Sequence, residues 1–107
     1  MTRKEILGVA EKCVCGDRGQ DYGSPEKSFM AIGKLWEIYL LEKFQQRRGT
    51  KILPEDVAAM MCLFKIARIA TGHGKADNWI DLAGYAACGG ELEGEHGATD
   101  KSALQGE

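Results

Sequence analysis

The stretch PEDVAAMMCLFKIAR, residues 54–68, decides the fold class. Proline is tolerated in the first turn of a helix because its missing N–H has no partner there, and the two acids after it suit the positive end of the helix dipole. Apolar residues then recur at intervals of three and four residues, as on one face of an α-helix. The stretch predicts a helix over residues 54–71 whose inner face holds Val57, Met60, Met61, Phe64, Ala67 and Arg68.

The rest of the chain repeats this helical pattern and contains no run with the two-residue period of a strand. The predicted helices span residues 3–15, 25–46, 54–71 and 77–88. Thr2 and Glu5 have the spacing of a capping box at the first start, and Gly89 and Gly90 mark the last end. We expect an all-α protein in the form of a compact four-helix bundle.

The longest predicted helix carries an aromatic stripe that we expect in the core. Its members are Phe29, Ile32, Gly33, Trp36, Tyr39, Leu40 and Phe44. Because this stripe and the apolar faces of the next two helices have the same helical period, we expect Trp36, Phe64 and Ile80 to be buried together. Four short helices cannot cover so many apolar side chains, so we also expect a homo-oligomer.

The end of the chain differs from the rest in composition. Residues 89–107 hold five acidic residues, one basic residue and several glycines, without any periodicity. This composition is typical of a disordered segment. We therefore predict a helical domain at residues 1–88 and a disordered, Gly-rich acidic tail at residues 89–107.

Charge and hydropathy limit the classes of function. Without its acidic end the chain is nearly neutral, whereas a DNA-binding domain is usually strongly basic, so we do not expect a nucleic-acid partner. No apolar run is long enough to span a bilayer, and the charged N-terminus does not fit a signal peptide. We expect a cytoplasmic protein without a membrane partner, whose four cysteines are reduced thiols rather than zinc ligands.

Two acids in the fourth predicted helix, Asp77 and Asp81, are four residues apart and share one helical face. The turn before this helix is short, so the helix returns beside the preceding one, on which Lys65 and Arg68 are neighbours. Two readings stay open. The charges form a structural network that locks the two helices together, or the acids hold Mg²⁺ and the cations bind phosphate.

The glycine-rich segment DRGQDYG, residues 17–23, adds two candidates to such a site. Its arginine can contact a phosphate, and its tyrosine can stack on a base, although a tyrosine beside glycine is more often a turn anchor. No catalytic residue is assigned. The predicted ligand-binding residues are Arg18, Tyr22, Lys65 and Arg68, and the predicted metal ligands are Asp77 and Asp81.

Four blocks in fixed order carry a family resemblance: DRGQDYGSPEKSF, LWEIYL, PEDVAAMMCLFKIAR and DNWIDLAGYA. Together they resemble a family of small, mostly phage-encoded proteins of unknown function, over roughly residues 17–88. More distantly, the chain is similar to all-α nucleotide pyrophosphohydrolases of the MazG and dimeric dUTPase type. Those enzymes hold Mg²⁺ with two helix-borne acidic motifs and hydrolyse a nucleoside triphosphate to a monophosphate and pyrophosphate.

The resemblance implies a nucleotide-binding protein of phage nucleotide metabolism in the host cytoplasm, with Mg²⁺-dependent pyrophosphohydrolysis as the candidate reaction. Only the second acidic motif has a counterpart, at Asn78 and Asp81 with Asp77 adjacent. In place of the first motif the chain has Lys65 and Arg68. The alternative function is a non-catalytic helical interaction module, in which the same Lys/Arg–Asp network is structural.

Overall fold

The computed structural model describes residues 1–15, 25–72 and 75–96 of the chain. Four helices make up most of this part, and no strand occurs in it. They are α1 (Arg3–Cys15), α3 (Pro25–Arg47), α4 (Pro54–Ala70) and α5 (Ala76–His96). The all-α prediction is confirmed, and three of the four predicted helices match to within one residue at each end.

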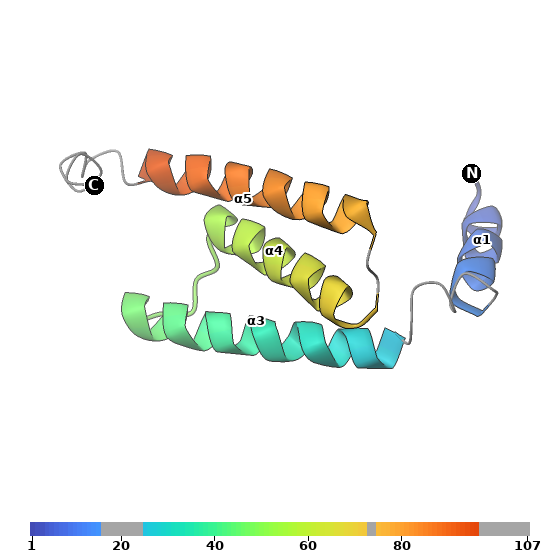
Figure 1. Ribbon diagram of the computed structural model, residues 1–107, viewed down its shortest axis with the longest axis horizontal. Coiled ribbons are helices and arrows are strands. Elements are labelled where there is room, and N and C mark those ends of the chain that lie inside the picture. The colour runs from blue at the N-terminus through green and yellow to red at the C-terminus, as the bar shows by residue number, and fades with distance from the viewer. Residues whose placement is uncertain (16–24, 73–74, 97–107) are drawn as a thin grey trace.

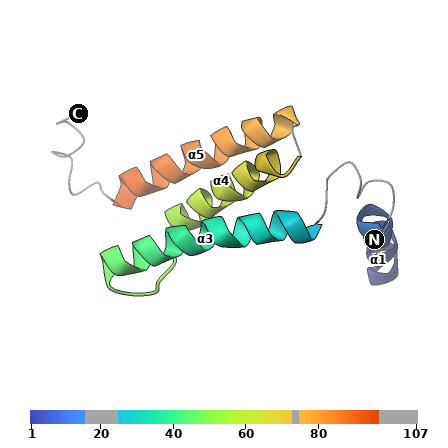
Figure 2. The same cartoon turned by 60° about the horizontal axis from the view of Figure 1, so that its bottom comes forward.

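The helices form an open layer rather than a closed bundle. Helix α4 lies between α3 and α5, packs along the length of α5 and crosses α3 less extensively (Figures 1 and 2). Helix α1 stands apart at the end of the layer where α3 begins (Figure 1). The packing is therefore more open than we expected of a compact bundle, because among the described residues no fourth helix covers the layer.

Local signals explain where the helices begin. Glu5 and Thr2 each accept a backbone hydrogen bond from the other at 3.1 Å, which confirms the capping box of α1. At the start of α4, the side chain of Asp56 accepts the backbone N–H of Leu53 at 2.7 Å. This bond caps the helix, because it satisfies an N–H group that has no partner within the helix. The same carboxylate is used again in a side-chain cluster described below.

Helix α5 extends beyond its predicted end. We predicted that Gly89 and Gly90 stop the helix, but it continues through both to His96. A Cβ atom on Gly89 would lie only 3.0 Å from the Cβ of Ala58, so this glycine allows α5 to approach α4 closely. Gly89 therefore allows close helix packing and does not end the helix. Residues 97–107 of the predicted tail lie outside the described residues.

The core of the described part is small. Its buried hydrophobic residues are Ile32, Ala58 and Ala67. Trp36 and Phe64 are partly buried, and the Trp36 indole N–H donates to the Met60 carbonyl at 2.7 Å. Ile80 is 65% exposed, so its predicted burial with Trp36 and Phe64 is wrong, because a single layer of helices gives its outer positions nothing to pack against.

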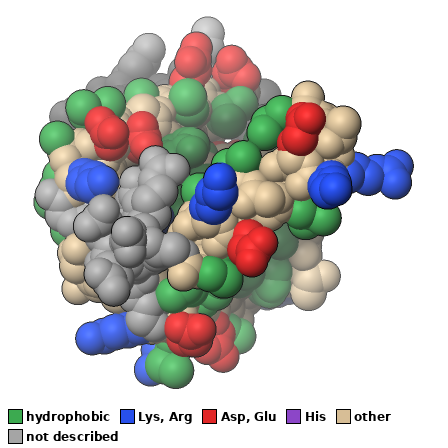
Figure 3. All heavy atoms as spheres, turned by 90° about the vertical axis from the view of Figure 1, so that its right-hand side faces the viewer, with side chains coloured by type: hydrophobic (Ala, Val, Ile, Leu, Met, Phe, Trp, Pro, Cys, Tyr) green, Lys and Arg blue, Asp and Glu red, His purple; other side chains and the backbone are tan. Residues whose placement is uncertain are grey.

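Much apolar surface therefore stays exposed, and at the end of the molecule shown in Figure 3 hydrophobic side chains lie among acidic and basic ones. Among the described helices, none combines the length and the apolar character that a membrane span requires. The four cysteines all lie in the described residues, and no disulfide joins any of them.

Candidate functional site

The predicted contact between α4 and α5 is present as an ion pair. Lys65 Nζ lies 2.9 Å from Asp81 Oδ2. The lysine side chain is 14% exposed, whereas the aspartate side chain is 48% exposed, so the cation is fixed against the protein while half of the carboxylate faces solvent. The short turn between the two helices produces this contact, as we expected from the sequence.

The second predicted cation has a partner that we did not predict. Arg68 Nε donates to the side-chain oxygen of Asn78 at 3.1 Å, and Asn78 is buried at 3% exposure. The structural reading of the sequence placed Arg68 in one network with Asp77 and Asp81, but neither of these two described acids forms an ion pair with it. Asn78 lies three residues before Asp81 and therefore on the same side of α5. The spacing could have predicted that the Asn78 amide also reaches α4, but we named Asn78 only as part of an acidic motif.

Phe64 connects these cations to an apolar groove. Lys65 Nζ lies 5.3 Å and Arg68 Cζ 5.7 Å from the centre of the Phe64 ring, within the range of cation–π contacts. The same ring lines a groove of about 300 Å³ between α3 and α4. The other residues of this aromatic groove are Phe29, Ile32, Gly33 and Trp36.

The remaining predicted site residues are only partly placed. Asp77 is exposed at the start of α5, one turn before Asp81, and makes no ion pair with any described residue. Nowhere in the described part do three or more His, Cys, Asp or Glu side chains gather as a metal site would require. Arg18 and Tyr22 lie outside the described residues, so their roles stay predictions.

A second charged cluster, at the opposite end of α4, was not predicted. Asp56 is 1% exposed and accepts hydrogen bonds from both Arg47 guanidinium Nη atoms, from the Tyr39 hydroxyl at 2.8 Å and from the Leu53 N–H. Arg47 also donates to the Lys51 carbonyl at 3.4 Å. The cluster ties the end of α3 to the start of α4 and to the linker between them.

The cluster shifts the ionisation of its members in opposite directions. The hydrogen bonds from Arg47 hold the pKa of the Asp56 carboxyl well below its usual range, although burial opposes them. Burial, followed by the hydrogen bond to Asp56, raises the pKa of Tyr39 to about 12. The bond to Asp56 also raises the pKa of Arg47. At neutral pH, Asp56 and Arg47 therefore stay charged and Tyr39 stays neutral. Groups whose ionisation is fixed in this way favour a structural role for the cluster.

The sequence contained a signal for this cluster. An acid at the third position of a helix, shortly after a helix that ends in arginine, can pair across the intervening linker. We assigned Asp56 only to the dipole of its own helix. That assignment accounts for its position but not for its contact with Arg47, because helix periodicity says nothing about how a linker folds back.

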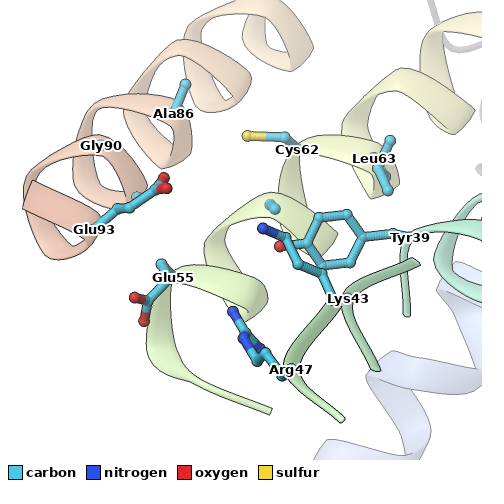
Figure 4. Close-up of a pocket in the computed structure, with 11 residues that line it drawn as sticks. Tyr39, Lys43, Arg47, Glu55, Cys62, Leu63, Ala86, Gly90 and Glu93 are labelled. Carbon is cyan, nitrogen blue, oxygen red and sulfur yellow. The ribbon is translucent and has the colours of Figure 1, made fainter. Parts of the chain in front are cut away.

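A cleft of about 510 Å³ lies beside this cluster, among α3, α4 and α5. Figure 4 shows Glu93 of α5 across the cleft from Lys43 and Tyr39 of α3. Cys62 lines the same cleft; its Sγ donates to the Leu82 carbonyl at 3.6 Å, and burial raises the pKa of its thiol. None of the predicted site residues that the structure describes lines this cleft.

Comparisons with known proteins found a matching family model and similar phage proteins. A family model described as "Domain of unknown function (DUF6378)" matches residues 5–93. The Gene 55 protein of Mycobacterium phage L5 is 42% identical over 81 residues, which are 76% of this chain and 47% of that protein. The Gene 55 protein of Mycobacterium phage D29 is 40% identical over 86 residues, which are 79% of this chain and 51% of that protein.

The chain thus spans about half the length of these two curated relatives. No solved structure matches it. The phage relatives agree with the phage-encoded family that the four sequence blocks resemble.

Proposed function

The chain belongs to the DUF6378 domain family, and within that family we propose that it binds nucleotides at the Lys65–Asp81 end of α4 and α5, as a homo-oligomer in the nucleotide metabolism of a phage. The single observation that carries this proposal is the position of Phe64. Its ring belongs to the aromatic groove and also lies within 6 Å of two cationic groups. A nucleotide has the same two parts, a flat apolar base and a polyanionic chain.

The groove suits the base. Its walls include three aromatic rings, Phe29, Trp36 and Phe64, and its volume of about 300 Å³ is at the lower end for a small-molecule pocket. Stacking on aromatic side chains accepts any base, because every base has a π-face. We therefore expect weak discrimination among bases at this groove.

The cations suit the phosphates. Lys65 and Arg68 are held by Asp81 and Asn78, so their side chains are ordered before a ligand arrives. Lys65 is only 14% exposed, so in this proposal a phosphate oxygen reaches its ammonium group from the side of the half-exposed Asp81. In this proposal Arg18, from the segment outside the described residues, adds a further phosphate contact and Tyr22 a further stacking surface.

Mg²⁺ fits the acids as a partner of the nucleotide. Magnesium is usually held by one or two carboxylates together with substrate phosphates and water. Asp77 and Asp81 supply two carboxylates one helical turn apart, which is sufficient for an ion that arrives with the phosphates. Two-metal hydrolysis needs more ligands, so binding, rather than pyrophosphohydrolysis, is the function that the geometry supports best.

Thermal melts test the proposal. The wild-type chain is melted alone and with a panel of nucleoside triphosphates, each with and without Mg²⁺; ligand binding raises the melting temperature by mass action. Asp81→Asn should abolish the Mg²⁺-dependent part of the shift. Glu91→Gln, which alters an exposed acid of the same helix, is the matched control and should leave the shift unchanged. Absence of any shift in the wild type would reject the proposal.

A second candidate function is a non-catalytic helical interaction module. Exposed aromatic side chains favour it, since Phe29 is 69% and Trp79 60% exposed. In that case the Lys65–Asp81 pair only locks two helices, so Asp81→Asn should lower the melting temperature equally in every ligand condition. The same melts therefore separate the two functions.

A further inference from the structure

The cleft beside the Arg47–Asp56 cluster continues into a larger apolar face of the layer. On α4 the cleft is lined by Ala59, Cys62 and Leu63, and one helical turn further on the same row reaches Ile66, which is 42% exposed. On α5 it is lined by Ala86, and two turns earlier the same row holds Trp79, which is 60% exposed. We name this surface, defined by Tyr39, Leu63, Ile66, Trp79 and Ala86, the cleft face.

Nothing in the described part of the chain can cover the cleft face. A stable domain usually has two packed layers around its core, and α3, α4 and α5 provide one. The other described helix, α1, has 13 residues and is therefore about 20 Å long, enough to cover one helix but not three. In the proposal developed below, a partner supplies the second layer.

The size of the face matches a second copy of the chain. Helix α4 has 17 residues and is about 26 Å long, and three helices packed 8 to 10 Å apart give a layer roughly 28 Å wide. The face therefore covers roughly 700 Å², close to the 800 Å² or so that each partner buries in a stable interface. A second copy of the chain would present a face of the same size.

Charge complementarity favours one orientation of a second copy. At the cleft end of the layer, α3 carries Lys43 while α5 carries Glu93, and both line the cleft. A two-fold axis that runs parallel to α4, between the two layers, places α3 of one copy on α5 of the other at this same end. Lys43 then meets the partner's Glu93, and the reciprocal contact forms by symmetry.

We propose that two copies of the chain pair through their cleft faces, about a two-fold axis parallel to α4, so that α3 of each copy lies on α5 of the other. This inference deepens the homo-oligomer in the proposed function and names its surface. It does not depend on whether a nucleotide binds.

The first test is the mass of the full chain in solution, measured by sedimentation over a range of micromolar concentrations. The wild type should be a dimer, and Ile66→Glu should raise the dimer dissociation constant by at least about tenfold, because it buries a charge in the interface. Ile80→Glu is the matched control. Ile80 is 65% exposed but is turned about 100° away from Trp79 on α5, so this variant should stay dimeric.

The second test mixes two charge variants at Lys43 and Glu93, which both line the cleft. Lys43→Glu gives a chain with two acids at the paired positions, and Glu93→Lys gives a chain with two bases. Each variant alone should dimerise roughly tenfold more weakly or worse, because like charges meet across the axis. A 1:1 mixture should dimerise like the wild type, because every contact in the mixed dimer joins opposite charges.

The outcomes separate this inference from the proposed function. A monomeric wild type would reject both the pairing and the homo-oligomer, while nucleotide binding stands or falls by its own melts. A wild-type dimer that tolerates Ile66→Glu, or whose charge variants do not recover on mixing, would reject the cleft face alone. Circular dichroism of each variant shows whether the helices are retained.

Discussion

The two ends of α4 carry the same kind of interaction in opposite settings. At its start, Asp56 is 1% exposed and receives four hydrogen bonds, from Arg47, Tyr39 and Leu53. At its other end, Lys65 pairs with an aspartate, Asp81, that is 48% exposed. A carboxylate with all its partners supplied by the protein stabilises the fold, whereas one that still faces solvent retains the capacity to bind a ligand.

The largest expected effect comes from breaking the buried end. Asp56→Ala should lower the free energy of unfolding by about 3 to 5 kcal/mol, because it leaves the Arg47 guanidinium and the Tyr39 hydroxyl without their partner. Urea unfolding followed by circular dichroism measures the change. Glu37→Ala, which removes an exposed acid of α3, serves as the control and should change stability by less than about 0.5 kcal/mol.

Acid should weaken the buried end of α4. The pKa of Asp56 is lower in the folded chain than its ordinary value of 3.8, so its ionised form stabilises the fold above that value. This stabilisation should be lost progressively as the pH falls below about 4 and the unfolded state takes up the proton first. Stability measured between pH 7 and pH 2 should fall for the wild type, and an Asp56→Asn variant that still folds should show a smaller slope.

A milder change at the same end removes one hydrogen bond. Tyr39→Phe should cost about 1 kcal/mol, since Asp56 keeps its bonds to Arg47 and Leu53. In the wild type, stability should also fall above pH 10, because the Tyr39 pKa is raised to about 12 and the unfolded chain releases this proton first. If Tyr39→Phe shows the same alkaline slope as the wild type, the hydroxyl is not held as the structure shows.

The smallest effect on stability is expected at the open end. Asp81→Asn should cost no more than about 1 kcal/mol, because the carboxylate is half exposed and solvent screens its pairing with Lys65. Urea unfolding at two salt concentrations measures both the loss and its screening. A loss of 3 kcal/mol or more would instead identify this pair as a second lock.

The sequence predicted what depends on helix periodicity and on short turns. Helix starts at Arg3, Pro25 and Pro54 were confirmed because capping residues and proline act locally. The contact of Lys65 with Asp81 was confirmed as well, because a short turn leaves neighbouring helices little choice.

What could not be predicted depends on how helices pack and how linkers fold back. The burial of Ile80 was wrong, since a helical stripe shows which side is apolar but not whether another layer covers it. The end of α5 was wrong because Gly89 serves close packing on Ala58, a contact that is not visible in the chain itself. The Arg47–Asp56 pair was missed because it joins two helices across a linker.

One calorimetric titration tests the central claim most directly. A nucleoside triphosphate with Mg²⁺ is titrated into the wild type, into Lys65→Met at the open end and into Tyr39→Phe at the buried end. The account predicts that Tyr39→Phe binds with the wild-type dissociation constant, whereas Lys65→Met binds at least about tenfold more weakly because it loses a charge-assisted phosphate contact. No binding to the wild type, or equal binding by Lys65→Met, would contradict it.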